Sequence, residues 1–289
     1  MNTVSVIRRV FKLLPDPFES AARKIYYYQR HWAHPSLKGT GSVQDLYYWV
    51  SDGTVDTMLL LQNYFSVFYP NLDTDTHGSV RIYNESGQLL GEKRFDLSKF
   101  ATVKLMLSPL LAEFEVPRTV AFGTLECHLE VPNAIMAQSE GDYFFDRFYI
   151  GYTTNLGQPA FVHGVDKTHI YREDKPQSVL WYEKPNNHQW APEIPIDIDD
   201  YEKIKVIMIN RTSDKSLTTL EVSDSNDKLK KWETFIEPGG VHRFELTRSN
   251  LNDLDPKELR LKIIGMATRI GRPVLFKEFQ NGAISVMHC

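Results

Sequence analysis

IGYTTNLGQP, at residues 150–159, recurs as IGMATRIGRP at residues 264–273, so the two segments lie 114 positions apart (264 − 150). Ile, Gly, Thr, Gly and Pro are identical in the two, and Leu156 is replaced by the similar Ile270. Each segment is a strand-like run that leads into a turn marked by glycine and proline. We interpret the match as an internal repeat, which predicts two related β-rich domains in tandem.

The repeat extends upstream at a different offset. Residues 205–210 match residues 66–71 in this interpretation, because each is an apolar run that ends in asparagine. Residues 219–222 match residues 79–82. The offset is 139 at the asparagines (210 − 71) and 114 later, so we expect about 25 extra residues in the first copy (139 − 114).

Alternation of apolar and polar residues predicts the kind of sheet. Between Gly123 and Val131, Leu125, Cys127 and Leu129 alternate with Glu126, His128 and Glu130. This period of two is typical of an antiparallel strand with one buried face. Short strands separated by frequent turn residues favour sandwiches. The predicted fold class is all-β: two tandem related antiparallel β-sandwich domains with a short helical N-terminal extension.

The predicted domain boundaries follow changes in composition. Residues 1–42 form a basic helical extension, since apolar residues at helical spacing alternate with Arg8, Arg9 and Lys12 before prolines interrupt the pattern. Residues 43–175 form the first sandwich with its insert, residues 176–200 a proline-rich connector, and residues 201–289 the second sandwich.

Composition restricts the class of function. A chain of 289 residues suits two domains. The net charge of −4 gives no basic surface for nucleic acid, so we expect no nucleic-acid partner. Cys127 and Cys289 are too few for a disulfide framework and favour free thiols in a reducing compartment. We find no signal-peptide pattern and no run of transmembrane length, so we expect a cytoplasmic protein.

One histidine pair carries a metal hypothesis. His163 and His169 flank Asp166 in a predicted hairpin over residues 161–171. Imidazole and carboxylate are ligands of zinc and iron, so these three residues are the candidate divalent-metal site. At the offset of 114 their counterparts are Lys277 and Ala283, which would make the histidines special to the first copy. The alternative is a pair of surface or packing histidines, and we therefore predict no cofactor.

Two further segments carry binding hypotheses. The connector contains the candidate ligand-binding residues Trp181, Tyr182 and Trp190, whose rings suit stacking on a sugar or an apolar ligand unless they pack in a core. Residues 4–32 suit a membrane surface, a partner protein or packing back onto the chain's own sandwich. The phosphate-binding, dinucleotide and hydrolase motifs are absent from the sequence, so we predict no catalytic residue.

Each copy has a recurring order of features. An apolar strand ends in Asn, and a strand, a Ser/Gly/Asp turn, a polar strand, an Ile-Gly-x-x-Thr strand and a Pro-led last strand follow. This order resembles the small β-sandwich proteins similar to the sensory-rhodopsin transducer, over about 90 residues of each copy. The chain departs from that family in its tandem arrangement, helical N-terminus and insert. The resemblance implies a β-sandwich that binds a partner or small molecule without catalysis, and it transfers no site residue.

We therefore predict a non-catalytic tandem β-sandwich protein that binds a protein partner or a small molecule. One alternative is a metal-dependent enzyme with a His/Asp site on the 161–171 hairpin. The other is a peripheral membrane or assembly factor that docks through residues 4–32. A homo-oligomer is compatible with each of these.

Overall fold

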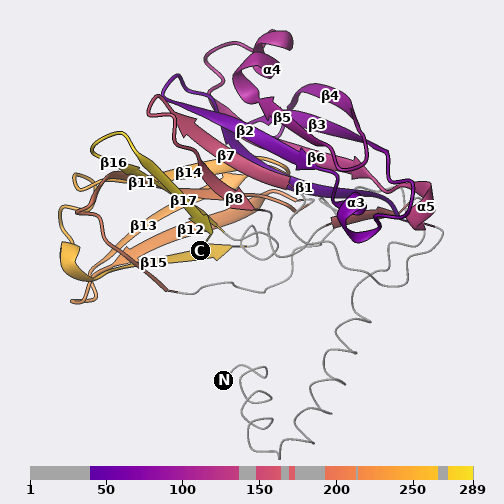
Figure 1. The fold of residues 1–289 in the computed structure, drawn as a ribbon. Helices are drawn as coiled ribbons and strands as arrows, with labels where there is room; N and C mark the ends of the chain where they lie inside the picture. Colours follow the sequence, from indigo (N-terminus) through magenta and orange to yellow (C-terminus); the bar gives the residue numbers. More distant parts are fainter. Residues whose placement is uncertain are drawn as a thin grey trace, which may run out of the picture.

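The computed structural model describes residues 40–136, 148–163, 169–172, 193–212, 214–265 and 273–288. Its strands form four antiparallel sheets that pack as two sandwiches, coloured indigo to pink and orange to yellow in Figure 1. The predicted all-β fold with two related antiparallel sandwiches is confirmed. Residues 1–39 of the predicted helical extension lie outside the described residues. Among the described helices, none has the length and apolar character needed to cross a membrane.

The first sandwich consists of two sheets, which we name sheets A and B. Sheet A has the strand order β4-β3-β6-β1-β9, and sheet B has the order β5-β2-β7-β8. Three short helices, α3, α4 and α5, connect the strands. The elements are β1 (Thr40–Val50), β2 (Val55–Gln62), α3 (Tyr64–Phe68), β3 (Thr76–Asn84), β4 (Leu89–Leu97), β5 (Thr102–Met106), α4 (Leu107–Glu113), β6 (Phe122–Glu130), α5 (Asn133–Met136), β7 (Phe148–Thr154), β8 (Ala160–His163) and β9 (His169–Arg172).

The second sandwich consists of sheets C and D. Sheet C has the order β10-β15-β12-β13, and sheet D has the order β14-β11-β16-β17. Its first strand, β10, lies within the stretch predicted as the connector. The elements are β10 (Ile194–Ile196), β11 (Tyr201–Ile209), β12 (Ser216–Ser223), β13 (Leu229–Ile236), β14 (Val241–Leu246), the 3₁₀ helix η2 (Pro256–Glu258), β15 (Leu259–Gly265), β16 (Val274–Phe279) and β17 (Ile284–His288).

The two sandwiches share one topology. Strands β4-β3-β6-β1 of sheet A correspond in order to β13-β12-β15-β10 of sheet C, and β5-β2-β7-β8 of sheet B correspond to β14-β11-β16-β17 of sheet D. Strand β9 is an addition to the first copy among the described strands. The internal repeat is therefore a repeat of eight strands in the same order.

The sequence match that suggested the repeat is not a structural match. Ile150 lies in β7 of sheet B, whereas Ile264 lies in β15 of sheet C, and the counterpart of β7 is β16. Residues 66–68 likewise lie in α3, and the counterpart of β11 is β2. Both sequence matches were therefore wrong as structural equivalences. Segments that lead into a turn are rich in the same few residue types, so non-equivalent segments can have similar sequences.

The turn that joins β3 to β4 recurs between β12 and β13. Asn84 Oδ1 accepts from the backbone N–H groups of Ser86 and Gln88, and Asp224 Oδ1 accepts from those of Asn226 and Lys228. The preceding strands start 140 positions apart (216 − 76) and alternate between buried and exposed residues in the same pattern. This register aligns β3 with β12 residue by residue.

Each sandwich has an apolar core made by alternating residues. The core of the second sandwich lies between sheets C and D and includes Val206, Leu220 and Leu261. The core of the first sandwich continues into sheet D, where it includes Ile207 and Phe276. Successive residues of β11 therefore point into different cores, which explains why this strand is buried on both faces.

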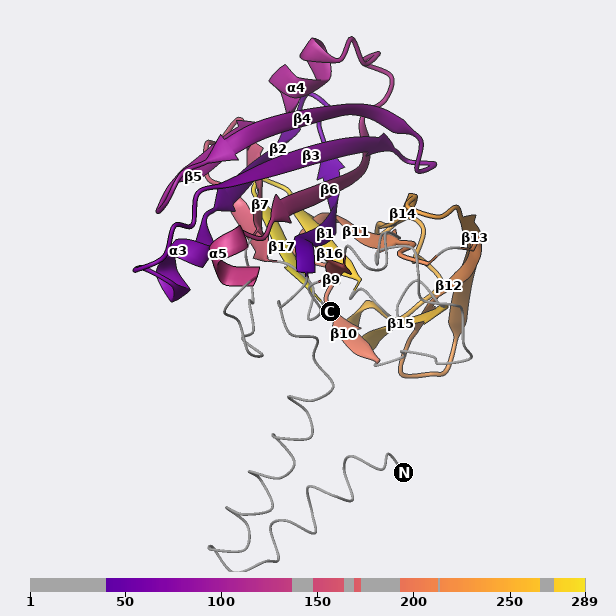
Figure 2. The same cartoon turned by 90° about the vertical axis from the view of Figure 1, so that its right-hand side faces the viewer.

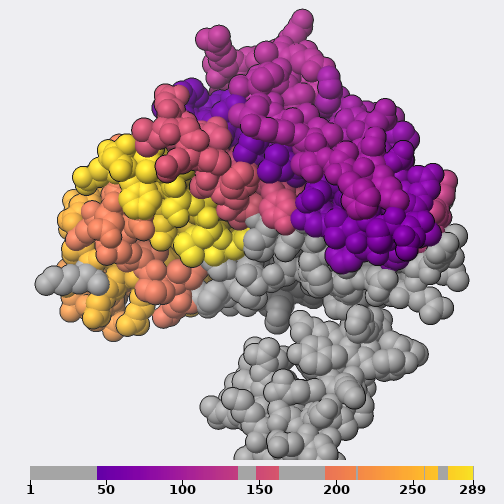
Figure 3. Space-filling model, viewed as in Figure 1, coloured from indigo at the N-terminus to yellow at the C-terminus, as the bar shows by residue number. Residues whose placement is uncertain are grey.

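Polar contacts also join the two sandwiches, which meet along β8 and β17. In Figure 3 the pink and yellow parts of the chain lie against each other. Arg211 Nη1 donates to Asp45 Oδ1 at 2.7 Å, and only 3% and 5% of the two side chains are exposed. The Tyr152 and Phe276 rings meet edge to face with centroids 5.2 Å apart. A buried ion pair and shared apolar residues hold the two sandwiches in one arrangement.

Side chains protect the edge of β1 where the short strand β9 no longer covers it. Arg211 Nη2 donates to the backbone oxygen of Leu46, and Tyr152 Oη donates to that of Tyr48 at 2.9 Å. Thr57 Oγ1 bonds both the N–H and the C=O of Val50, at 2.9 and 2.8 Å. Backbone groups at a sheet edge that are buried need such partners, so this edge is closed to another strand.

Candidate functional site

A polar groove of about 460 Å³ lies on the outer face of sheet A, the face turned away from sheet B. It is formed by β4, β3 and β6, which lie side by side in Figure 2. Its volume falls in the range typical of small-molecule sites. The residues that line it are His77, Gly78, Ser79, Arg81, Glu92, Arg94, Phe95, Asp96, His128 and Glu130.

The lining side chains are arranged in rows across the strands. Ser79 pairs with Arg94 on one side and with His128 on the other, and we call these three residues the middle row. Cross-strand partners on one face of an antiparallel sheet lie about 5 Å apart at Cβ, so the middle row is continuous. His77 and Asp96 form the next pair, with 2.7 Å between Nδ1 and Oδ1.

A single carboxylate orients both arginines of the groove. Arg81 Nε donates to Glu92 Oε2 at 3.0 Å, and Arg94 Nε donates to Glu92 Oε1 at 2.9 Å. The pKa of Glu92 is lowered, first by the hydrogen bond from Arg94 and then by that from Arg81. These three side chains therefore carry a net charge of +1 at neutral pH.

A buried carboxyl group supports this arrangement from β6. Only 1% of Glu126 is exposed. Its Oε2 accepts from Tyr83 Oη at 2.7 Å and lies 3.6 Å from Arg81 Nη1, whereas Oε1 has no hydrogen-bond partner among the described residues. Burial raises the pKa of Glu126, although Tyr83 and Arg81 oppose the shift. A buried carboxyl with an unpaired oxygen costs about 1–3 kcal/mol of stability.

His128 is neutral at physiological pH. Burial, and after it the positive charge of Arg81, lowers the pKa of His128 to about 4, with a further contribution from Arg94. The ring therefore offers one N–H donor and one acceptor nitrogen. The influence of both arginines on this ring places all three groups in one electrostatic environment.

The second sandwich provides an internal comparison. Thr219 pairs with Glu233 and Ile264, as Ser79 pairs with Arg94 and His128. In the adjacent row the charges are reversed between the copies, because Arg81 with Glu92 and Glu126 corresponds to Glu221 with Lys231 and Lys262. The same scaffold therefore forms without the residues of the groove.

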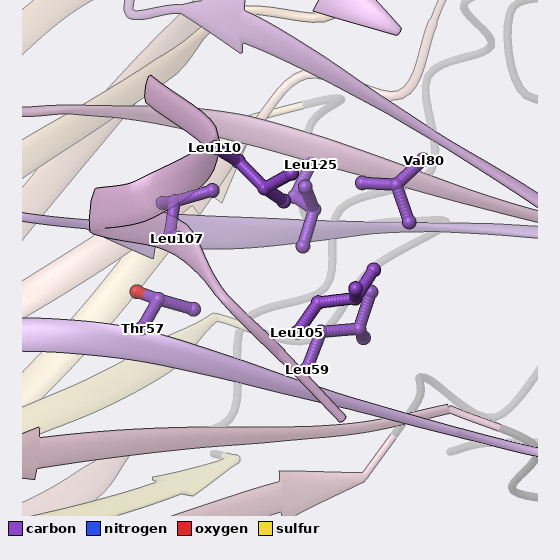
Figure 4. Close-up of a pocket in the computed structure, with 7 residues that line it drawn as sticks. All are labelled: Thr57, Leu59, Val80, Leu105, Leu107, Leu110 and Leu125. Carbon is purple, nitrogen blue, oxygen red and sulfur yellow. The ribbon is translucent and has the colours of Figure 1, made fainter. Parts of the chain in front are cut away.

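A second cavity, of about 10 Å³, lies inside the first sandwich (Figure 4). It is no larger than about one water molecule, and its lining is apolar except for Thr57, whose hydroxyl already bonds Val50. This cavity is a packing void below α4. The residues drawn in Figure 4 are Thr57, Leu59, Val80, Leu105, Leu107, Leu110 and Leu125.

The hairpin predicted for residues 161–171 does not form. Strand β8 pairs with β7 in sheet B, and β9 pairs with β1 in sheet A, so His163 and His169 belong to different sheets. The counterpart of His163 is His288 rather than Lys277, since Val162 pairs with Ile150 as Met287 pairs with Leu275. The hairpin was predicted because strands that follow each other closely in the sequence usually pair, and these two strands do not.

The metal hypothesis for His163, Asp166 and His169 stays a prediction, because Asp166 and the two imidazole rings lie outside what the structure describes. Within the described part of the chain, no group of three or more His, Cys, Asp or Glu residues is arranged to hold a metal ion. Elemental analysis of the protein beside a His163→Ala/His169→Ala variant tests the hypothesis. About one metal per chain, lost in the variant, would support it.

The remaining sequence-derived candidates lie outside the described residues. They are the connector aromatics Trp181, Tyr182 and Trp190 and the docking segment over residues 4–32. The groove was not predicted as a site, but a signal for it was present. The polar residues between Gly123 and Val131 were predicted to lie opposite the buried face, residues 79–83 alternate in the same way, and the groove lies where these two polar faces meet.

Comparisons with known proteins add little to this picture. No protein-family model matches the chain. No curated protein matches it either. Among solved structures, it is similar to a β-glucuronidase from glycoside hydrolase family 2, with 8% sequence identity and a TM-score of 0.19, over 86% of this chain and 23% of that one. The chain thus spans 23% of that enzyme's length, and so low a TM-score carries no functional conclusion.

Proposed function

We propose that this protein is a non-catalytic binding protein and that the groove on the outer face of sheet A holds a small polar ligand. The observation that carries the proposal is the middle row, Arg94, Ser79 and His128, for which the second sandwich has Glu233, Thr219 and Ile264 at the same places. Since the scaffold does not need these residues, a role in binding accounts for them.

The chemistry of the groove favours binding over catalysis. Glu92 is held in ion pairs with two arginines, and the nearby Tyr83 stays protonated because burial and Glu126 raise its pKa. His128 is neutral and Arg81 is fixed by carboxyl groups on both sides. Fixed hydrogen-bonding groups of this kind orient a ligand and give it specificity. The predicted resemblance to sensory-rhodopsin-transducer-like proteins implies the same kind of role and stays a prediction.

Ligand-detected saturation-transfer NMR tests the proposal with three small polar probes, D-sorbitol, D-gluconate and spermidine. The test variant is Arg94→Glu/His128→Ile, which carries the residues of the second sandwich at these two positions. The matched control is Glu233→Arg on the second sandwich. We expect at least one probe to give a signal with the wild type and the control and to lose most of it with the test variant.

Two results would contradict the proposal. One is that no probe binds the wild type, and the other is that binding is the same in the test variant. Circular dichroism and the thermal midpoint of each variant check that loss of signal is not loss of fold. Turnover of any probe by the purified protein would replace binding by catalysis as the function of the groove.

A further inference from the structure

The middle row of the groove is rich in hydrogen-bond donors. The Arg94 guanidinium, the Ser79 hydroxyl and the neutral His128 ring lie in register across three strands. Arg81 follows in the adjacent row, two residues along β3 from Ser79. Donors that converge from several strands suit a ligand group that only accepts hydrogen bonds.

Arg94 keeps its donor capacity after its structural contact is made, and Arg81 keeps only the part that does not face Glu126. Glu92 bonds the Nε atom of each, which fixes the guanidinium planes. The Nη groups of Arg94 have no further partner among the described residues, and 83% of that side chain is exposed. A guanidinium group that is held at Nε can still present its paired N–H groups to a carboxylate or phosphate in a bidentate manner.

Three acidic residues line the groove: Glu92 is held in ion pairs with Arg81 and Arg94, and the other two lie on the opposite side of the middle row. Asp96 and Glu130 line the end near His77, beyond the middle row. Asp96 and Glu130 repel an anion from that end, and the guanidinium groups of Arg94 and Arg81 attract it to the middle row. Carboxylates accept hydrogen bonds, so the same end suits hydroxyl groups of the ligand.

We infer that the groove holds an oxyanion group of its ligand over the middle row, with Arg94, Arg81, Ser79 and His128 as donors. The ligand class is therefore a small acid that also carries hydroxyl groups. This inference rests on the proposed function, because it names the chemistry of the ligand for the same groove. It also uses the second sandwich as a contrast, because Glu233 places a carboxylate at the position of Arg94.

Isothermal titration calorimetry of the full chain tests the inference with D-gluconate, D-sorbitol and sulfate at constant ionic strength. D-gluconate and D-sorbitol are both six-carbon polyols, and one carboxylate replaces a terminal alcohol. We expect D-gluconate to bind at least about tenfold more tightly, since a charge-assisted pair with arginine is worth about that factor. Competition by sulfate would assign the site to oxyanions in general, and its absence would assign it to carboxylates.

The variant Arg94→Gln locates the effect. It should lower the affinity for D-gluconate about tenfold and leave that for D-sorbitol unchanged, whereas Glu233→Gln on the second sandwich should change neither. The His128 ring gives an independent NMR readout, because a bound anion raises its pKa above the value of about 4. The charged neighbours that act on this ring are Arg81, Glu92 and Arg94, while Gln44 lies opposite it on β1.

Equal affinity for D-gluconate and D-sorbitol, with binding still lost in Arg94→Glu/His128→Ile, would overturn the inference and leave the groove as a binding site. Preferred binding of D-gluconate that Arg94→Gln does not weaken would also overturn it, since the anion would then lie elsewhere. Failure of every probe to bind would contradict both the inference and the proposed function.

Discussion

Asn63 and Asn210 occupy the same place in the two sandwiches and close them in the same way. Asn63 follows β2 and donates from Nδ2 to the backbone oxygens of Thr74 and Leu97 at 2.7 and 3.1 Å. Asn210 follows β11 and donates from Nδ2 to those of Asp214 and Ile236, both at 2.8 Å. Each amide thus ties the end of one sheet to the last residue of a strand in the facing sheet.

These two asparagines should be among the most sensitive polar positions. Both side chains are fully buried, so Asn63→Ala or Asn210→Ala leaves backbone groups without partners. We expect each change to lower the free energy of unfolding by about 2–4 kcal/mol in urea titrations. Asn84→Ala, in an exposed turn, should cost about 1 kcal/mol or less. A loss no larger at Asn63 or Asn210 than at Asn84 would show that these amides do not close the sheets.

The buried pair of Arg211 and Asp45 should behave as one unit. Arg211→Met leaves the Asp45 carboxylate buried without its cation, so we expect a loss of about 3–5 kcal/mol of unfolding free energy. Asp45→Asn in the same chain should restore part of that loss, because the unpaired charge is removed. The check is a double-mutant cycle by urea unfolding, with the exposed Glu113→Gln as the comparison. Strictly additive effects would mean that the pair does not couple the sandwiches.

Two glycines with the same φ allow the cost of backbone strain to be distinguished from the cost of a steric clash. Gly87 and Gly157 both have φ of +77°. A Cβ at Gly87 would collide with the backbone oxygen of Pro238 in the second sandwich, whereas one at Gly157 meets nothing within 4 Å. Gly157→Ala should therefore cost about 1–2 kcal/mol from strain alone, and Gly87→Ala should cost clearly more. Equal thermal midpoints for the two variants would show that the backbone at Pro238 moves away from the added Cβ at no measurable cost.

The low pKa of His128 predicts a pH dependence of stability. The folded ring stays neutral down to about pH 4, while the unfolded chain takes up the proton near pH 6.5. As the pH falls between these values, the unfolded state binds more protons, so stability falls by about 1.4 kcal/mol per pH unit from this group. Urea unfolding at pH 7 and pH 5 should show a smaller drop for His128→Gln than for the wild type. The shifts at Glu126 and His242 are present in both proteins and cancel in the comparison.

Sequence periodicity predicted the strand between Gly123 and Val131 correctly, but similarity of sequence did not predict which strands of the two copies are equivalent. Leu125, Cys127 and Leu129 are buried in the core as predicted from their alternation. The segments at Ile150 and Ile264, by contrast, are alike in sequence and lie in non-equivalent strands. The local sequence indicates that a strand and a turn are present. The position of that strand in a sheet depends on its packing against residues far along the chain.

The groove forms only when β3, β4 and β6 pair in register, so no single segment of the sequence predicts it. Ser79, Arg94 and His128 are separated by up to 49 residues (128 − 79), and none has a diagnostic motif around it. Alternation correctly placed Glu126 on the face opposite the apolar residues, but it did not predict that Glu126 is buried. Tyr83 Oη and Arg81 Nη1 lie against the Glu126 carboxyl group, and the paired sheet brings these side chains together.

The core that extends from Tyr152 to Phe276 has a consequence for biosynthesis. A chain leaves the ribosome from its N-terminus, and domains tend to fold as they emerge. All strands of the first sandwich are complete by Arg172, yet its core includes Val274 and Phe276 of β16. The nascent first sandwich must therefore wait, with part of its apolar surface uncovered, until roughly another hundred residues are translated (276 − 172). Translation that ends before β16 leaves that surface open to chaperones or to aggregation.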